Sequence, residues 1–241
     1  MLFLKVKMLN FLKISFKSLK KREWALWLGS LVLISVAFAF SSGKGVMQYI
    51  ASLIGATSLI FIAKGNVMGQ IITVAFSLMY GIISYFESYY GEMITYLGMT
   101  MPMAIVAVIS WLKNPYKGDK TVVEVNKLRP LEYVLMLVVG LAVTTGFYFI
   151  LRALNTANLI VSTLSVLTSF IPVYLTARRS PFYALGYALN DIVLIVLWSI
   201  SSVSDLSNLS MVACFVVFLV NDIYALTNWI KMQKSQSKDK E

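Results

Sequence analysis

Long runs of apolar residues, interrupted by short polar breaks, follow one another along the whole 241-residue chain. Each run approaches the ~20 residues that an α-helix needs to cross the hydrocarbon layer of a bilayer. The runs lie near 24–40, 46–63, 67–86, 92–112, 131–151, 157–177, 182–200 and 209–230. The sequence therefore predicts an all-α membrane protein with about eight transmembrane helices, because helices satisfy their own backbone groups in lipid.

The composition argues against a soluble domain and against several kinds of chemistry. Hydrophobic residues make up 59% of the chain and charged residues 13%, whereas soluble domains have about 45–50% and about 25%. Histidine is absent and Cys214 is the single cysteine, so the commonest metal ligand is missing and an intrachain disulfide is impossible. We therefore predict no metal, no cofactor and no nucleic-acid partner, and a lipid bilayer as the surroundings.

Lysines and arginines are distributed unevenly among the predicted loops. With the N-terminus inside, Lys44 and Arg152 fall in outer loops and the remaining 19 of the 21 basic residues fall in inner segments. Cytoplasmic loops of membrane proteins carry such an excess. Both termini are therefore predicted to be cytoplasmic, as an even number of spans requires.

Residues 1–22 mix basic residues with Phe3, Phe11, Ile14 and Phe16. Two hypotheses remain open for them, a solvated basic tail and a helix that lies on anionic lipid. A signal peptide is not expected, because no small-residue cleavage pattern follows promptly.

A weak internal repeat divides the spans into two groups of three. A shift of 118 residues aligns Tyr80 with Trp198 and Trp111 with Trp229, and a shift of 114 aligns Lys64 with Arg178. A single helix between the triplets inserts them in the same orientation, which gives parallel repeats about an axis along the membrane normal. Chance similarity between apolar helices is the alternative.

The predicted organisation follows from these boundaries. It comprises a basic cytoplasmic segment 1–22, a peripheral first helix within 23–45, a first three-helix repeat 46–112, a cytoplasmic loop and linking helix 113–151, a second three-helix repeat 152–230, and a cytoplasmic tail 231–241.

Polar residues at helical spacing indicate which faces of the spans turn inward. One face of the span near 67–86 carries Gln70, Thr73, Ser77 and Tyr80. Such stripes also serve as helix-packing contacts, and for a single Ser or Thr that is the better interpretation.

Two Asn-Asp pairs lie near mid-membrane depth, at Asn190-Asp191 and Asn221-Asp222. A carboxylate at that depth costs about 3 kcal/mol and marks a functional site by default. A structural aspartate that is hydrogen-bonded to a neighbouring helix is the alternative. Amide groups beside aromatic side chains fit a small, flat, hydroxyl-bearing solute such as a nucleoside or a vitamin. The predicted substrate-binding residues are Tyr183, Tyr187, Asn190, Asp191, Trp198, Asn221, Tyr224, Gln70 and Tyr80.

These features together resemble the PnuC-type transporters, the nicotinamide riboside transporter family. The resemblance covers nearly the whole chain beyond the first helix. It is carried by Ala63-Lys64-Gly65-Asn66, by Met101-Pro102-Met103 followed by Trp111, by Arg178-Arg179 followed by a helix with Asn190, and by Asn221-Asp222-Ile223-Tyr224 ending at Trp229.

The resemblance implies a full-length relative of the SWEET sugar-transporter architecture in the bacterial inner membrane, with a 3+1+3 core. It implies uptake of nicotinamide riboside by facilitated diffusion, trapping by a cytoplasmic kinase, and a homotrimer. The chain departs from the family's W-x-x-W-x-x-x-N pattern, because the matching positions are Tyr183, Gly186 and Asn190. Thiamine, riboflavin or deoxynucleosides therefore remain alternative substrates.

A membrane enzyme and a non-transporting scaffold are the alternatives to a transporter. A membrane enzyme would place its carboxylates near the interface beside a metal or phosphate motif, which the sequence lacks. A non-transporting scaffold would use Asn190 for assembly and bind no solute. We predict a transporter and not an enzyme.

Overall fold

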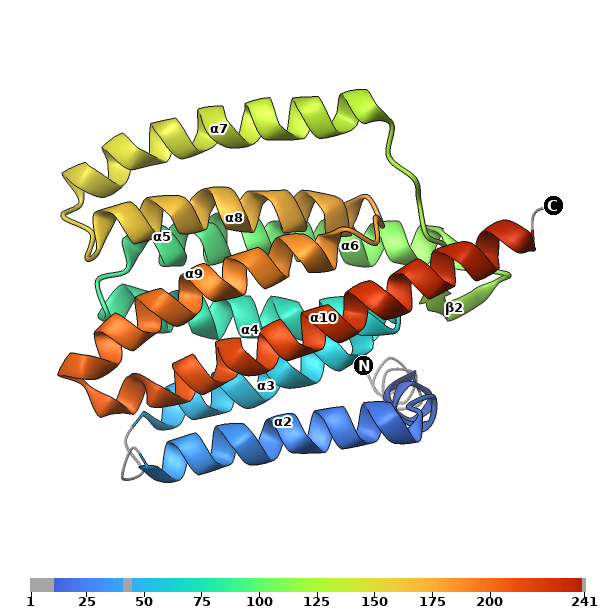
Figure 1. The fold of residues 1–241 in the computed structure, drawn as a ribbon, viewed down its shortest axis with the longest axis horizontal. Coiled ribbons are helices and arrows are strands. Elements are labelled where there is room, and N and C mark those ends of the chain that lie inside the picture. The colour runs from blue at the N-terminus through green and yellow to red at the C-terminus, as the bar shows by residue number, and fades with distance from the viewer. Residues whose placement is uncertain (1–10, 41–44, 240–241) are drawn as a thin grey trace, which may run out of the picture.

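Long helices run side by side along one axis of the molecule (Figure 1). The computed structural model describes residues 11–40 and 45–239. Within them, 8 helices are long and apolar enough to cross a membrane by length and composition, which confirms the predicted all-α membrane protein. The first part of the predicted basic segment, residues 41–44 between the first two spans, and the last two residues of the predicted tail lie outside the described residues.

The spans begin and end close to the predicted apolar runs. They are α2 (Lys21–Phe40), α3 (Val46–Ala63), α4 (Val67–Phe86), a fourth span of α5 (Tyr90–Ile94), the π-helix η1 (Thr95–Thr100) and α6 (Met101–Lys113), then α7 (Pro130–Ala153), α8 (Leu159–Ala177), α9 (Tyr183–Ser204) and α10 (Leu209–Lys238). A 3-10 turn, η2 (Leu206–Asn208), precedes α10, and β1 (Pro115–Tyr116) pairs antiparallel with β2 (Asp119–Val123).

Two elements differ from the regular helices that the sequence predicts. The fourth span contains the π-helix just before Pro102, whose missing N–H removes a regular helical bond at that point. The last helix continues past residue 230 to Lys238, where a tail was predicted. Gln236 holds this extension, because its side chain accepts from the Val125 N–H at 2.7 Å and donates to the Val123 carbonyl at 3.1 Å.

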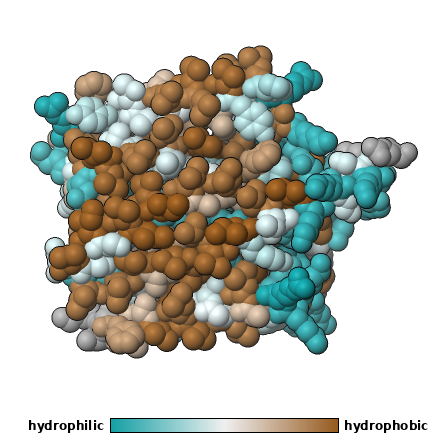
Figure 2. Space-filling model, viewed as in Figure 1, coloured by the Kyte–Doolittle hydropathy of each residue, from teal (hydrophilic) through white to brown (hydrophobic). Residues whose placement is uncertain are grey.

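Both ends of the described chain lie at the same end of the helix bundle, beside the β1–β2 hairpin (Figure 1). The space-filling view shows a broad apolar band over the helices and hydrophilic residues gathered at that end (Figure 2). This arrangement brings the basic segments of the chain together, as the count of lysines and arginines predicts.

Hydrogen bonds between the triplets are reciprocal. The Trp229 indole donates to the Ile62 carbonyl at 2.9 Å, and the Trp111 indole donates to the Thr176 carbonyl at 3.2 Å. The two indoles also contact each other, with ring centroids 5.5 Å apart. The two bonds occupy equivalent positions in the predicted repeats, because a shift of 118 residues takes Trp111 to Trp229 and a shift of 114 takes Ile62 to Thr176. A pair of repeats related by a twofold axis makes such contacts, so they support the predicted repeat.

The first span is attached to the core at its basic end. The Lys64 ammonium lies 2.8 Å from the buried Glu23 carboxylate, whose other oxygen accepts from the Tyr224 hydroxyl at 3.0 Å. Residues 11–17 are helical, and the Phe16 ring packs edge-on against Phe61 at 5.0 Å. This part of the basic segment therefore packs on the protein instead of forming a free tail.

The α3–α4 contact depends on a glycine. A Cβ at Gly69 would lie 2.5 Å from the Ile62 nitrogen and 2.7 Å from the Ser58 carbonyl oxygen, both backbone atoms of α3. We expect Gly69→Ala to lower the free energy of unfolding by about 2–3 kcal/mol, because the helices must move apart. Thermal unfolding of the purified protein measures this. The control Gly29→Ala meets nothing within 4 Å, and equal melting temperatures for both variants would contradict the close packing.

Candidate functional site

A narrow cavity lies between the two predicted triplets. It is lined by Gln70, Thr73, Thr100, Met103, Ala104, Val173, Thr176 and Tyr187, which come from α4, η1, α6, α8 and α9. Its volume is about 10 Å³, far below the about 300–1,000 Å³ of typical small-molecule sites. The structure is therefore a closed conformation, and a solute enters only when helices separate.

The α4 stripe presents unsatisfied polar groups to this region. Gln70 and Ser77 are buried, and the Gln70 Nε2 and Ser77 Oγ atoms have no hydrogen-bond partner among the described residues. A buried donor without a partner costs about 1–3 kcal/mol. Gln70, a predicted site residue, is thus placed where a polar solute would satisfy its amide.

Asn190 is oriented by the facing helix. Its carboxamide oxygen accepts hydrogen bonds from the Thr168 hydroxyl at 2.8 Å and the Ser169 hydroxyl at 3.0 Å. Both donors lie on α8. The carboxamide is thereby held in one orientation, and Asn190 is not among the residues that line the cavity.

Asp191 and Asp222 form a buried pair of carboxyl groups. Each is 2% exposed, and the two side chains lie within hydrogen-bonding reach of each other. The Oδ2 atom of each accepts no bond from any described residue. No lysine or arginine is buried in the described part of the chain. Such a pair is tolerated when its charge is balanced by a shared proton or by a bound cation.

Tyr80 and Trp198, aligned by the repeat, meet in the core. The Trp198 indole donates to the Tyr80 hydroxyl at 2.7 Å, and that hydroxyl donates to the Glu92 carboxylate at 3.2 Å. The Ser165 hydroxyl donates to the other Glu92 oxygen. These two predicted residues therefore build a polar network that joins both triplets. Glu92 was not among the predicted site residues, because it stands at the very start of the predicted apolar run 92–112.

The aromatic residues at the start of α9 occupy different surroundings. Tyr187 lines the cavity, whereas Tyr183 packs edge-on against Trp229 at 5.0 Å and its hydroxyl has no partner among the described residues. A Cβ at Gly186 would lie only 3.0 Å from Pro172 of α8. At Gly186, which matches the second Trp of the family pattern, α9 therefore contacts α8 directly, and no space is left there for an aromatic side chain.

Two predicted site residues turn away from the cavity. Asn221 donates to Ser30 Oγ at 3.2 Å and to the Val217 carbonyl at 2.8 Å, while the Tyr224 hydroxyl donates to Glu23. Ser30 and Glu23 belong to α2. Of the predicted site residues, Gln70 and Tyr187 line the cavity, whereas Asn221 and Tyr224 contact the first span.

Comparisons with known proteins agree on one kind of relative. Residues 45–231 match the family described as nicotinamide mononucleotide transporters. The nicotinamide riboside transporter PnuC of Neisseria mucosa is 25% identical over 219 residues, which are 88% of this chain and 82% of the relative. The Haemophilus influenzae protein of the same name is 22% identical over 227 residues, which are 92% and 96% of the two chains.

A solved structure has the same fold. The crystal structure of the vitamin B3 transporter PnuC superposes with a TM-score of 0.83 at 22% identity and covers 95% of this chain and 99% of that one. The fold comparison thus includes α2, which lies outside the residues that the family description matches.

Proposed function

The chain belongs to the nicotinamide mononucleotide transporter family, and on that premise we propose that it carries nicotinamide riboside, or a closely similar nucleoside-like vitamin, into the cell. It is a multi-pass membrane transport protein and not an enzyme. The proposal concerns its solute, its direction and its energetics.

The observation that carries the proposal is the buried pair Asp191 and Asp222, with no buried lysine or arginine among the described residues. The pyridinium ring of nicotinamide riboside is a cation, so a carboxylate pair favours it. The phosphate of the mononucleotide would instead meet uncompensated negative charge. The carboxyl pair therefore favours the riboside over the mononucleotide as the solute.

Transport in this proposal is facilitated diffusion by alternating access. The two triplets rock about the closed cavity between them, with both termini on the cytoplasmic side of a bacterial inner membrane. A cytoplasmic kinase phosphorylates the arriving riboside. The product then stays inside, because its phosphate is repelled by the same carboxylates.

A homotrimer is part of the proposal and is based on the family resemblance. Helix α7 lies at the edge of the bundle (Figure 1), and only 17% of its apolar 18-residue stretch is buried inside the protein. Its outer side is therefore free to contact lipid or a second copy of the chain.

Alternative solutes follow from the missing aromatic wall. With Tyr183 and Gly186 in place of two tryptophans, the ring of the solute is held less tightly by stacking. Thiamine, riboflavin and deoxynucleosides are therefore the runner-up substrates, and a non-transporting scaffold is the second alternative.

Uptake of radiolabelled nicotinamide riboside into proteoliposomes without any ion gradient tests the proposal. We expect saturable uptake that excess unlabelled riboside inhibits and the mononucleotide does not. Uptake of a labelled deoxynucleoside, thiamine or riboflavin in place of the riboside would establish an alternative solute. Absence of uptake for all of them, with folded protein in the vesicles, would favour the scaffold.

A further inference from the structure

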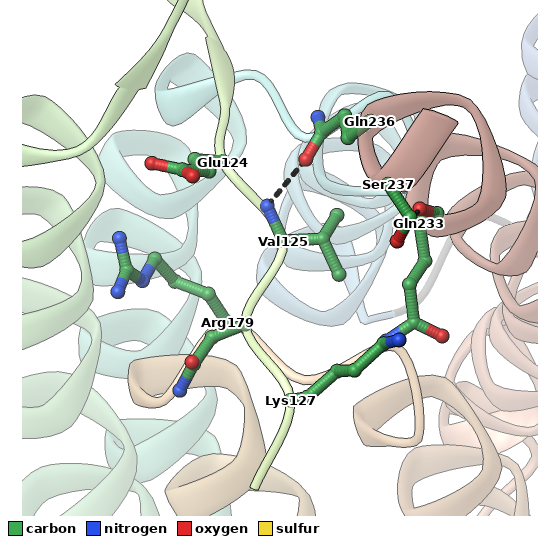
Figure 3. Close-up of a pocket in the computed structure, with 8 residues that line it drawn as sticks. Glu124, Val125, Lys127, Arg179, Gln233, Gln236 and Ser237 are labelled. Carbon is green, nitrogen blue, oxygen red and sulfur yellow. Dashed lines mark hydrogen bonds between the residues drawn. The ribbon is translucent and has the colours of Figure 1, made fainter. Parts of the chain in front are cut away.

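The segment that leads from the end of β2 toward α7 crosses the hydrophilic end of the bundle (Figure 3). We call its residues 123–126 the strap. All four consecutive N–H groups of the strap donate hydrogen bonds, so its path is fixed along its whole length. The acceptors, in chain order of the donors, are the Gly65 carbonyl at 3.0 Å, the Asn114 carbonyl at 2.9 Å, the Gln236 side chain at 2.7 Å and the Arg179 carbonyl at 3.0 Å.

These acceptors are divided between the two predicted triplets. Gly65 lies between α3 and α4, and Asn114 directly follows α6, so the first two bonds go to the first triplet. Gln236 lies on α10, and Arg179 lies between α8 and α9, so the last two go to the second triplet. The strap therefore ties the triplets together at the hydrophilic end.

Two of the acceptors occupy equivalent places in the predicted repeats. A shift of 114 residues takes Gly65 to Arg179, and both have a left-handed backbone, with φ of 69° and 59°. A non-glycine residue seldom adopts that conformation. Each of the two residues lies just past the end of a helix, α3 or α8, and each offers its carbonyl to the strap. The strap thus spans corresponding points of the two triplets.

The Gln236 side chain holds the middle of the strap. It accepts from the Val125 N–H and donates to the Val123 carbonyl at 3.1 Å, the two groups that a neighbouring β-strand would bond from one side. Figure 3 shows Gln236 on one side of the strap and Arg179 on the other. Gln236 is 6% exposed, although it lies on an extension that is otherwise largely open to solvent.

The closed cavity begins one turn away from the ends of the strap. Its lining includes Gln70, in the first turns of α4 after Gly65, and Thr176, in the last turn of α8 before Arg179. Separation of the triplets at the hydrophilic end would therefore connect this cavity with the solution at that end.

We propose that the strap is the latch of a gate at the hydrophilic end, and that Gln236 must release it before the triplets separate there. The proposal rests on the proposed function, in which the triplets rock about the cavity. Rocking opens one end while the other stays closed. The start of the strap moves with the first triplet and its end moves with the second, so the strap cannot keep all its bonds when this end opens. Loss of the Gln236 bonds shifts the population toward the open state.

Cysteine labelling in proteoliposomes tests the strap without any solute. Ala104→Cys places the reporter in the wall of the cavity, where Ala104 is 5% exposed in the closed structure. Lys234→Cys, at an exposed position of α10, identifies vesicles in which the strap faces a membrane-impermeant maleimide. In such vesicles we expect Gln236→Ala to speed the labelling of position 104 about tenfold, because it removes two hydrogen bonds of the strap.

Two further variants control this experiment. Gln233→Ala is the matched control, since Gln233 lies on the same extension and forms no side-chain hydrogen bond with the described strap. It should leave the labelling rate unchanged. Asn126→Ala removes the side-chain bond to the Arg178 carbonyl at 3.1 Å and should speed labelling by a smaller factor than Gln236→Ala. The native Cys214 is fully buried, so its labelling reports unfolding.

Equal labelling rates in Gln236→Ala and Gln233→Ala would overturn the proposal. A faster rate confined to vesicles that shield the strap from the reagent would do the same, because the opposite end would then be the one that opens. If Gln236→Ala unfolds the protein and exposes Cys214, the milder Asn126→Ala decides, and an unchanged rate in that variant would refute the latch. Since no solute is used, failure of the strap and failure of riboside transport are distinguishable.

Discussion

Replacing Asn190 with alanine is expected to lower the uptake of nicotinamide riboside about tenfold to a hundredfold. The change removes the amide that would donate to the solute and leaves the hydroxyls of Thr168 and Ser169 without their shared acceptor. Hydrogen bonds of this kind contribute about 0.5–1.5 kcal/mol each, and unpaired buried partners cost about 1–3 kcal/mol. Initial rates of uptake into proteoliposomes, normalised to folded protein, measure the effect.

Asn221 supplies a matched control for this substitution. It is buried as fully as Asn190, at 1% exposure for both, but its amide donates to Ser30 of the first span. Asn221→Ala should lower the melting temperature and retain uptake per folded molecule. The opposite pattern, with uptake lost in Asn221→Ala and kept in Asn190→Ala, would move the solute to the face of α10 that contacts α2.

The helices themselves could be predicted from the sequence because one physical rule dominates them. A backbone in lipid must form helices about as long as the bilayer is thick, so apolar runs bounded by Lys64 or by Arg178 mark spans almost to the residue. The repeat stays a prediction, which is supported by the contact between the rings of Trp111 and Trp229, residues that the shift of 118 aligns.

The choice between neighbouring helices could not be predicted from periodicity. Successive residues on a helix point about 100° apart, so Asn221 and Asp222 had to face different partners. Because α10 packs against α2, α3 and α9, it has more than one inward face, and a polar residue alone does not reveal which one it occupies. The π-helix at Thr95–Thr100 and the burial of Glu92 likewise depend on tertiary packing.

Conversion of the buried carboxyl pair to amides, Asp191→Asn/Asp222→Asn, is expected to abolish the transport of a cationic solute and to preserve the binding of a neutral one. In the proposed site the pair would balance the pyridinium charge, and no lysine or arginine is buried among the described residues to compete for it. Leaving a buried ion without its partner costs about 3–5 kcal/mol, so riboside uptake should fall at least about a hundredfold. Binding of an uncharged deoxynucleoside, measured by thermal shift, should be retained.

The same double variant also distinguishes a purely structural pair. If Asp191 and Asp222 only hold α9 against α10 through a shared proton, two amides of the same shape keep that contact and remove the cost of burying charge. The protein would then be equally or more stable and would still transport the riboside at the wild-type rate. That outcome would refute the assignment of the pair as a counter-charge. A stable variant that no longer transports the cationic riboside, but still binds the neutral deoxynucleoside, would support the assignment. The reason is that asparagine preserves the volume and the hydrogen bond and changes only the charge.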